Sequence, residues 1–173
     1  MKKVTLLCTL LFIAVASYTQ IFLEVSTLQG NTPQGQPVLS YSFGASNPVT
    51  MGGPGSGGGA GKASFSSFNF MMQKGKMSTE ILKALAKGTH FATATIKIYS
   101  QSGNGKGNSK SALSYQITLS EVLVESFQQS MGCGSKECEG PTETVSLAYS
   151  KIKIEDFESN TWVEHDIKKN STL

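Results

Sequence analysis

The stretch "MGGPGSGGGAGKAS", residues 51–64, is where the sequence comes nearest to a chemical motif. A glycine-rich run ending in Gly-Lys is typical of loops that bind nucleotide phosphates through backbone N–H groups. That motif needs Gly, four residues and then Gly-Lys-Ser/Thr, but Ser56 stands at the first glycine and Ala63 at the final hydroxyl. The residues that follow alternate like a strand, whereas a phosphate loop leads into a helix. We therefore interpret residues 47–62 as a long connection between two strands, and not as a nucleotide site.

The remaining polar residues predict no other chemistry. His90 and His165 are far apart in the sequence, and the acidic residues at 155, 156 and 158 are interpreted as a solvated surface run. The formal net charge of +3 is too small to favour nucleic acid as a partner. We expect no catalytic residues, no cofactor and no bound metal, and hence a structural or binding protein.

The N-terminus has the pattern of a secretory signal peptide. Lys2 and Lys3 precede an apolar stretch at residues 4–15, and Ala14-Val15-Ala16 provides small residues for cleavage. The stretch is short for a membrane span. We predict a signal peptide at 1–16 and a secreted or periplasmic protein without stable membrane insertion. The alternatives are an uncleaved N-terminal anchor, or a cytoplasmic protein if the segment is not a functional signal.

Cys133 and Cys138 are the two cysteines that remain after such a cleavage. An even number of cysteines in an oxidising compartment favours a disulfide, here across the short loop "CGSKEC". Two alternatives remain open. One is a zinc site, which would need His90 and His165 as further ligands, and the other is a free dithiol in the cytoplasm.

Alternating apolar and polar residues predict a protein made mainly of short strands. Phe65 is out of phase with Phe68 and Phe70, which indicates a bulge or bend. The segment 112–130 predicts one or two strands, broken near Ser120 and Glu121.

One short helix is predicted within residues 77–88. Ser78 is the expected N-cap, Glu80 lies in the expected first turn, and Gly88 stands where a glycine commonly ends a helix. The helix is too short to be stable alone and must pack on the sheet. Its predicted apolar face consists of Ile81, Leu82 and Leu85.

These elements predict a single-domain β-barrel of short antiparallel strands with one α-helix packed on its side. The domain is expected to span residues 17–157, and residues 158–173 are expected to form a polar C-terminal tail.

The order of the segments resembles the Hcp family, the hemolysin-coregulated tube proteins of bacterial type VI secretion. The resemblance is strongest where a Phe-rich strand, a short helix, Gly-x-His and an alternating strand follow one another. The similar segments are "IFLEVSTLQGN" (21–31), "VLSYSFGASNP" (38–48), "GKASFSSFNFMMQKGKMSTEILKALAKGTHFATATIKIY" (61–99), "ITLSEVLVESFQQS" (117–130) and "TETVSLAYSKIKIE" (142–155).

The resemblance implies a structural subunit that forms homohexameric rings. Such rings stack into a tube inside a contractile sheath, the tube carries a spike at its tip, and some effector proteins travel in its lumen. Sheath, spike and effector proteins are therefore implied partners. Proteins of this family usually lack a cleaved signal peptide and this cysteine pair. An exported Hcp-like surface or periplasmic binding protein is the alternative function.

By the same resemblance, the long connection would contact neighbouring subunits or rings. The candidate assembly residues are Asn47, Pro48, Met51, Gly52, Gly53, Pro54, Gly55, Gly57, Gly58, Gly59, Gly61 and Lys62.

If the signal peptide is functional, the mature chain begins close to Ser17. Mass spectrometry of the protein from its native host should then find a chain that lacks residues 1–16. Recovery of the intact chain from the cytoplasm would contradict this prediction.

Overall fold

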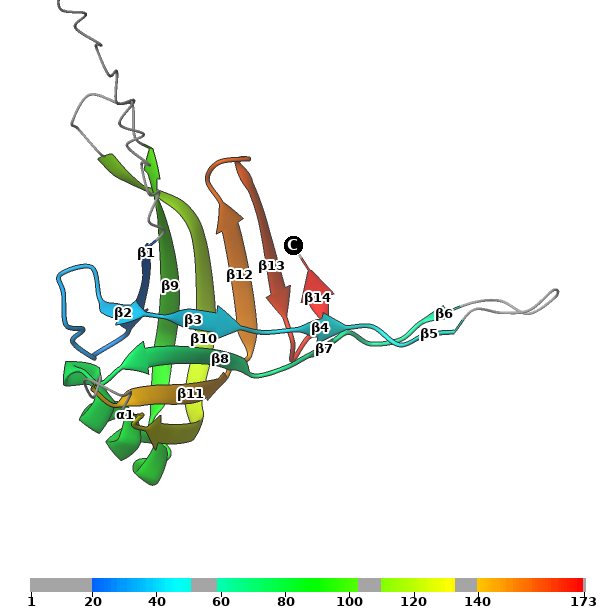
Figure 1. The fold of residues 1–173 in the computed structure, drawn as a ribbon. Coiled ribbons are helices and arrows are strands. Elements are labelled where there is room, and N and C mark those ends of the chain that lie inside the picture. Colours follow the sequence, from blue (N-terminus) through cyan, green and yellow to red (C-terminus); the bar gives the residue numbers. More distant parts are fainter. Residues whose placement is uncertain (1–19, 51–58, 103–109, 133–139, 173) are drawn as a thin grey trace, which may run out of the picture.

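The part of the chain that the structure describes is mainly β, with one α-helix, as the sequence predicted. The computed structural model describes residues 20–50, 59–102, 110–132 and 140–172 (Figure 1). The elements are β1 (Gln20–Val25), β2 (Gln36–Val38), β3 (Ser40–Ser42), β4 (Ala45–Ser46), β5 (Val49–Thr50), β6 (Gly59–Ala60), β7 (Ser64–Phe65), β8 (Phe68–Gln73), α1 (Lys76–Lys87), β9 (His90–Ser102), β10 (Lys110–Ser130), β11 (Thr142–Ala148), β12 (Lys151–Asp156), β13 (Thr161–Asp166) and β14 (Ser171–Thr172).

Strand β10 is the centre of the main sheet. It is 21 residues long, and its first two thirds pair with β9 along one edge. On the other edge it pairs first with β12, up to Ser120, and then with β11, from Leu123 onward. Between these partners lies Glu121, which has a positive φ of 53°. The break predicted near Ser120 and Glu121 is thus a bend within one continuous strand.

The sheet continues from β10 in three directions. Beyond β9 lie β1 and β2, beyond β11 lie β8 and β3, and beyond β12 lie β13 and β14. All the pairings are antiparallel, as predicted.

The sheet is not closed into the barrel that the sequence predicted. The segment from β2 to β3 changes partner at Leu39, pairing with β1 before it and with β8 after it. The N–H of Leu39 donates to the carbonyl of Met71 at 2.7 Å, which marks the change. Among the described residues β2 pairs with β1 alone and β3 with β8 alone, so no single strand joins these two edges of the sheet.

The core lies between the curved sheet and the helix. The fully buried side chains come from β1, β8, β9, β10 and β11, and α1 covers the end of the core beside β10. From α1, the buried residues are Met77, Ser78, Ile81 and Ala84. Leu82, predicted to face the core, is 50% exposed, so the prediction was wrong at this position. The largest fully buried side chains on the strands include Leu23, Phe68, Met72, Ile96, Ile117 and Leu119.

The start of α1 differs from the prediction. The N-cap is Gly75, and Ser78 lies at N3, where its Oγ accepts a hydrogen bond from the N–H of Gly75 at 2.8 Å. The side chain of Asn31 accepts from the N–H of Lys76 at 2.8 Å. Asn31 belongs to the loop between β1 and β2, so tertiary structure provides part of the cap. Glu80 consequently lies beyond the first turn.

The end of α1 was predicted correctly. Gly88 adopts the left-handed conformation, with φ 61° and ψ 38°, and the N–H of Thr89 donates to the carbonyl of Ala84 at 2.9 Å. This bond satisfies one of the carbonyls in the last turn that have no partner inside the helix.

The segment 158–173, interpreted from sequence as a polar tail, contributes two strands to the sheet. β13 pairs with β12 along its whole length, and β14 pairs with the end of β13. Its strands place one side chain, His165, in a buried position.

Replacing Gly88 by Ala should destabilise the protein by about 1 kcal/mol, because a Cβ is strained in the left-handed conformation. The added Cβ would meet no atom within 4 Å, so the cost comes from the backbone alone. The matched control is Gly140→Ala, which also meets no atom within 4 Å but has no positive φ. Urea unfolding should lower the midpoint for the first variant only, and equal midpoints would refute the argument.

Candidate assembly surface: a projecting arm and its root

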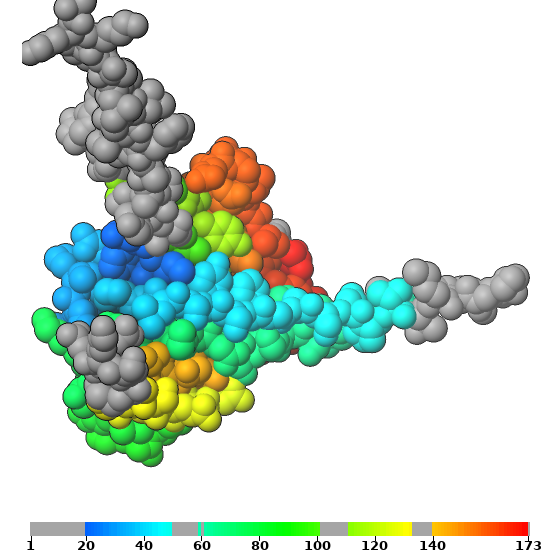
Figure 2. Space-filling model, viewed as in Figure 1, coloured from blue at the N-terminus to red at the C-terminus, as the bar shows by residue number. Residues whose placement is uncertain are grey.

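A two-stranded arm extends from the body of the molecule. We define the arm as residues 44–50 and 59–66, which include the pairs β4–β7 and β5–β6 (Figure 1). The described part from Ala45 to Thr50 is about 20 Å long at about 3.3 Å per residue. In Figure 2 its outer part, formed by β5 and β6, stands clear of the rest of the described chain. Residues 51–58 lie outside the described residues.

The arm contains part of the predicted assembly loop. The described members of that loop are Asn47, Pro48, Gly59, Gly61 and Lys62, and the structure places them along the ribbon. The sequence indicated a connection without regular structure, whereas its described ends form antiparallel pairs. Met51, Gly52, Gly53, Pro54, Gly55, Gly57 and Gly58 lie outside the described residues, and so do Cys133 and Cys138 of the predicted disulfide.

Close backbone contacts hold the two sides of the arm together. The N–H of Gly61 donates to the carbonyl of Pro48 at 2.8 Å. A Cβ on Gly61 would lie 2.7 Å from Cγ of Pro48, so this close approach requires glycine. We call the place where the arm joins the body, at Gly44 and Ser66, the root of the arm. These two residues are joined by two hydrogen bonds, one from each backbone N–H. The glycine that suggested a phosphate loop in the sequence therefore serves strand pairing.

An aromatic cluster connects the arm to the core. The ring of Phe68, which is fully buried, stacks on Tyr41 at 5.5 Å and on Phe43 at 5.8 Å between ring centroids. On the other side of the root, Phe65 stacks on His165 at 4.7 Å. The slip in phase between Phe65 and Phe68 falls where the chain passes from β7 of the arm to the core strand β8. The bend predicted from that slip is confirmed.

Hydrogen bonds support the same root. The hydroxyl of Tyr149 donates to the carbonyl of Ser66 at 3.1 Å, and Ser67 donates from its Oγ to the carboxylate of Glu125. Burial raises the pKa of Tyr149 above its ordinary value of 10.0, and the hydroxyl would hold its proton at neutral pH even without this shift.

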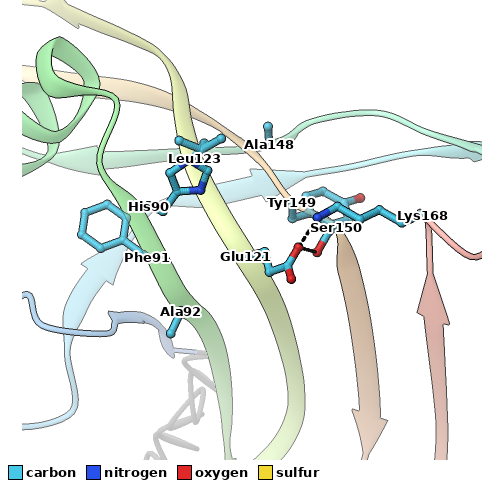
Figure 3. Close-up of a pocket in the computed structure, with 9 residues that line it drawn as sticks. All are labelled: His90, Phe91, Ala92, Glu121, Leu123, Ala148, Tyr149, Ser150 and Lys168. Carbon is cyan, nitrogen blue, oxygen red and sulfur yellow. Dashed lines mark hydrogen bonds and ion pairs between the residues drawn. The ribbon is translucent and has the colours of Figure 1, made fainter.

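An open groove of about 560 Å³ lies beside the root (Figure 3). Tyr149 lines this groove and also binds Ser66 at the root. Its floor is mainly apolar, but Glu121 accepts hydrogen bonds from Lys168 and from the hydroxyl of Ser150. The bond from Lys168 is the main cause that lowers the pKa of the Glu121 carboxyl below its ordinary value of 4.5. The groove is lined by His90, Phe91, Ala92, Glu121, Leu123, Ala148, Tyr149, Ser150 and Lys168.

The polar side chains of the groove bind each other. The carboxylate and ammonium groups of the groove neutralise each other, and the groove is open to solvent. Across the described ranges, no group of three metal-binding side chains is present. His90 and His165, the zinc ligands of one alternative, lie in different places. His90 is exposed at the start of β9, and His165 is buried against the arm.

Sequence reasoning missed most contacts at the root. The partners of Phe65 and Ser66 are His165 and Tyr149, which come from distant parts of the chain. In the sequence, only the phase slip at Phe65 indicated that the chain changes direction here.

Comparison with known proteins decides the family. The sequence profile of a family described as "Type VI secretion system effector, Hcp" matches residues 22–155. The chain belongs to the Hcp family. The resemblance derived from the ordered segments is therefore confirmed, and with it the assignment to the tube proteins of type VI secretion. No curated protein sequence is significantly similar to the chain.

Solved Hcp structures share the fold. Hcp1 from Salmonella typhimurium aligns with a TM-score of 0.68 at 19% identity, over 90% of this chain and 100% of that chain. A protein described as a type six secretion system protein aligns with a TM-score of 0.74 at 20% identity and the same coverage. The secreted protein Hcp3 from Pseudomonas aeruginosa aligns at 0.58 and 15% identity, over 87% of this chain and 98% of that chain. No helix within the described ranges has the length and hydropathy to cross a bilayer.

The pair of Glu121 and Lys168 should weaken in acid. Because the pair lowers the pKa of Glu121 in the folded state, its contribution is present above the ordinary value of 4.5. The contribution is lost as the pH falls through the lowered value, where the carboxyl becomes protonated. A double-mutant cycle of Glu121→Gln and Lys168→Met, read by urea unfolding, should show coupling at pH 7 that disappears in acid. Coupling that persists unchanged at pH 2 would contradict the prediction.

Proposed function

We propose that the protein is a subunit of a type VI secretion tube, and that its arm makes the contacts between neighbouring copies. The Hcp family assignment supports a tube protein that associates with itself. The single observation that carries the role of the arm is its position clear of the body (Figure 2).

The physics of a small ribbon supports this role. A hairpin of two strands is at best marginally stable alone in water, because it buries little apolar surface. In the described part of the arm, Val49 is 60% exposed, and no third strand pairs with β5 or β6. A second protein surface would bury such residues and cover the free edges of the ribbon. The arm is thus suited to a partner outside its own chain.

Docking of the arm on a neighbour would make a head-to-tail contact, because the arm and the surface that receives it differ. Repeated contacts of this kind generate a ring when the rotation between copies closes. We propose a homohexameric ring that stacks into a tube, with effectors carried in its lumen. The sheath and spike proteins of the same machine are the other proposed partners.

The N-terminal sequence favours a second candidate function. A chain exported through the pattern at Lys2, Lys3 and residues 4–16 would leave the compartment in which a tube assembles. A disulfide between Cys133 and Cys138 would agree with such export. In that case the protein is an Hcp-like surface or periplasmic binding protein outside a contractile machine.

The test is the oligomeric state of the protein with and without the end of the arm. Light scattering and negative-stain microscopy should find hexameric rings for the wild type. Deleting residues 51–58 should leave the far-ultraviolet circular dichroism unchanged and shift the protein toward monomers. The matched control deletes residues 103–109, a Gly/Asn-rich segment of similar length between β9 and β10.

Two results would overturn the proposal. A wild type that stays strictly monomeric at high concentration would favour the exported binding protein. Rings that form equally well without residues 51–58 would remove the arm from the assembly contact.

A further inference from the structure

The C-terminal hairpin, residues 161–172, makes a specific contact with the arm. We propose that this hairpin sets the direction of the arm, with His165 as the positioning residue. The imidazole of His165 lies between the two parts. One face stacks on Phe65 at 4.7 Å and an interplanar angle of 26°, and Nδ1 lies 2.7 Å from the hydroxyl of Thr172. Only 9% of His165 is exposed.

The hairpin is itself held firmly to the body. His165 pairs with Ile152 of β12, and the N–H of Ile167 donates to the carbonyl of Ser150 at 2.9 Å. Lys168 binds Glu121 at the bend of β10, and Lys151 lies 3.5 Å from Asp166. The position of the imidazole is therefore determined by the main sheet.

The arm needs such a support. Its strands β4 and β7 pair only with each other, so backbone pairing does not fix the angle of the ribbon to the sheet. The bond from Tyr149 to Ser66 fixes one backbone point, about which a ribbon can still turn. A ring stacked on Phe65, one residue away, provides a second point. Two points of contact on the same strand restrict the rotation that a single hydrogen bond permits.

The contact depends on the ring of His165 and not on its second nitrogen. Nε2 is buried and has no hydrogen-bond partner in the described structure. An unpaired buried polar atom is unfavourable, so replacing Nε2 by carbon removes no hydrogen bond. The bond between Nδ1 and Thr172 is lost in both His165→Phe and His165→Ala, so the two variants differ in the ring. This allows a clean comparison, in which His165→Phe retains the stacking surface and His165→Ala removes it.

The inference deepens the proposed function, on which its consequence for assembly rests. If the arm docks on a neighbouring copy, it loses conformational freedom when it docks. This loss is smaller for an arm held in one direction than for an arm whose direction varies. The hairpin follows the segment 22–155 that the family profile matches. Through this contact the C-terminal hairpin, which the sequence predicted to be a polar tail, would contribute to assembly.

The direct test measures the distribution of arm directions. Cys8, Cys133 and Cys138 are replaced by Ser in the full chain, and nitroxide labels are attached at Lys62→Cys on the arm and Lys83→Cys on α1. Labelled protein is mixed with a large excess of unlabelled protein, so that electron–electron resonance reports distances within one copy. We expect the width of the distance distribution to at least double in His165→Ala and to stay unchanged in His165→Phe.

Further variants keep the test independent of one substitution. Phe65→Ala removes the same contact from the side of the arm and should give the same broadening if His165→Ala folds poorly. Trp162→Ala is the matched control, since it also removes an aromatic ring from β13. Trp162 is 58% exposed and its ring lies near Lys153. It should leave the width unchanged.

The outcomes separate the two proposals. Unchanged widths in both His165→Ala and Phe65→Ala, or equal broadening in His165→Phe, would overturn the positioning role of His165 whatever the state of assembly. A broadened distribution with rings that still form normally would retain the positioning role and remove the arm from the assembly contact. A broadened distribution with at least a tenfold higher concentration needed for rings would support both.

Discussion

The fold depends on one constraint, the change of partner along the edge of β10. A single strand of 21 residues pairs first with β12 and then with β11, and it turns at Glu121 between them. A residue with positive φ bends the strand at this point. After the bend one branch of the sheet continues through β11 and β8, and before it the other continues through β12 to β14, with Ile152 of β12 still part of the core.

The two branches meet again at the root of the arm. The branch through β11 and β8 supplies Phe68, which stacks on the aromatic residues at the beginning of the arm. The branch through β12 and β13 supplies His165, which stacks on Phe65 at its end. The connection between β11 and β12 supplies Tyr149. A ribbon with little core of its own is thus supported by both halves of the divided sheet.

The groove lies beside the same bend. Glu121, Ser150 and Lys168 lie where the branches separate, and they bind each other rather than leaving a charge free for chemistry. The groove therefore contains a paired carboxylate and ammonium. Apart from the groove, the chain exposes the free edges of the ribbon β5–β6, which are suited to contact with another protein surface.

Local patterns in the sequence predicted many features correctly. Alternation of apolar residues located the strands, the phase slip at Phe65 located the bend before β8, and Gly88 ended the helix where expected. The start of α1 was wrong, because part of its cap comes from Asn31, 45 residues away. The family could be recognised because the order of these local patterns spans most of the chain.

By itself, the sequence determined which segments form strands, which forms the helix and where the chain bends, because these depend on neighbouring residues. Only the tertiary structure decided which strands become neighbours. It showed that the sheet divides instead of closing, that residues 59–61 pair back on residues 48–50, and that His165 contacts Phe65. The physical reason is that these contacts join residues far apart in the chain. Their stability comes from burial and hydrogen bonding in the assembled core, which no local pattern records.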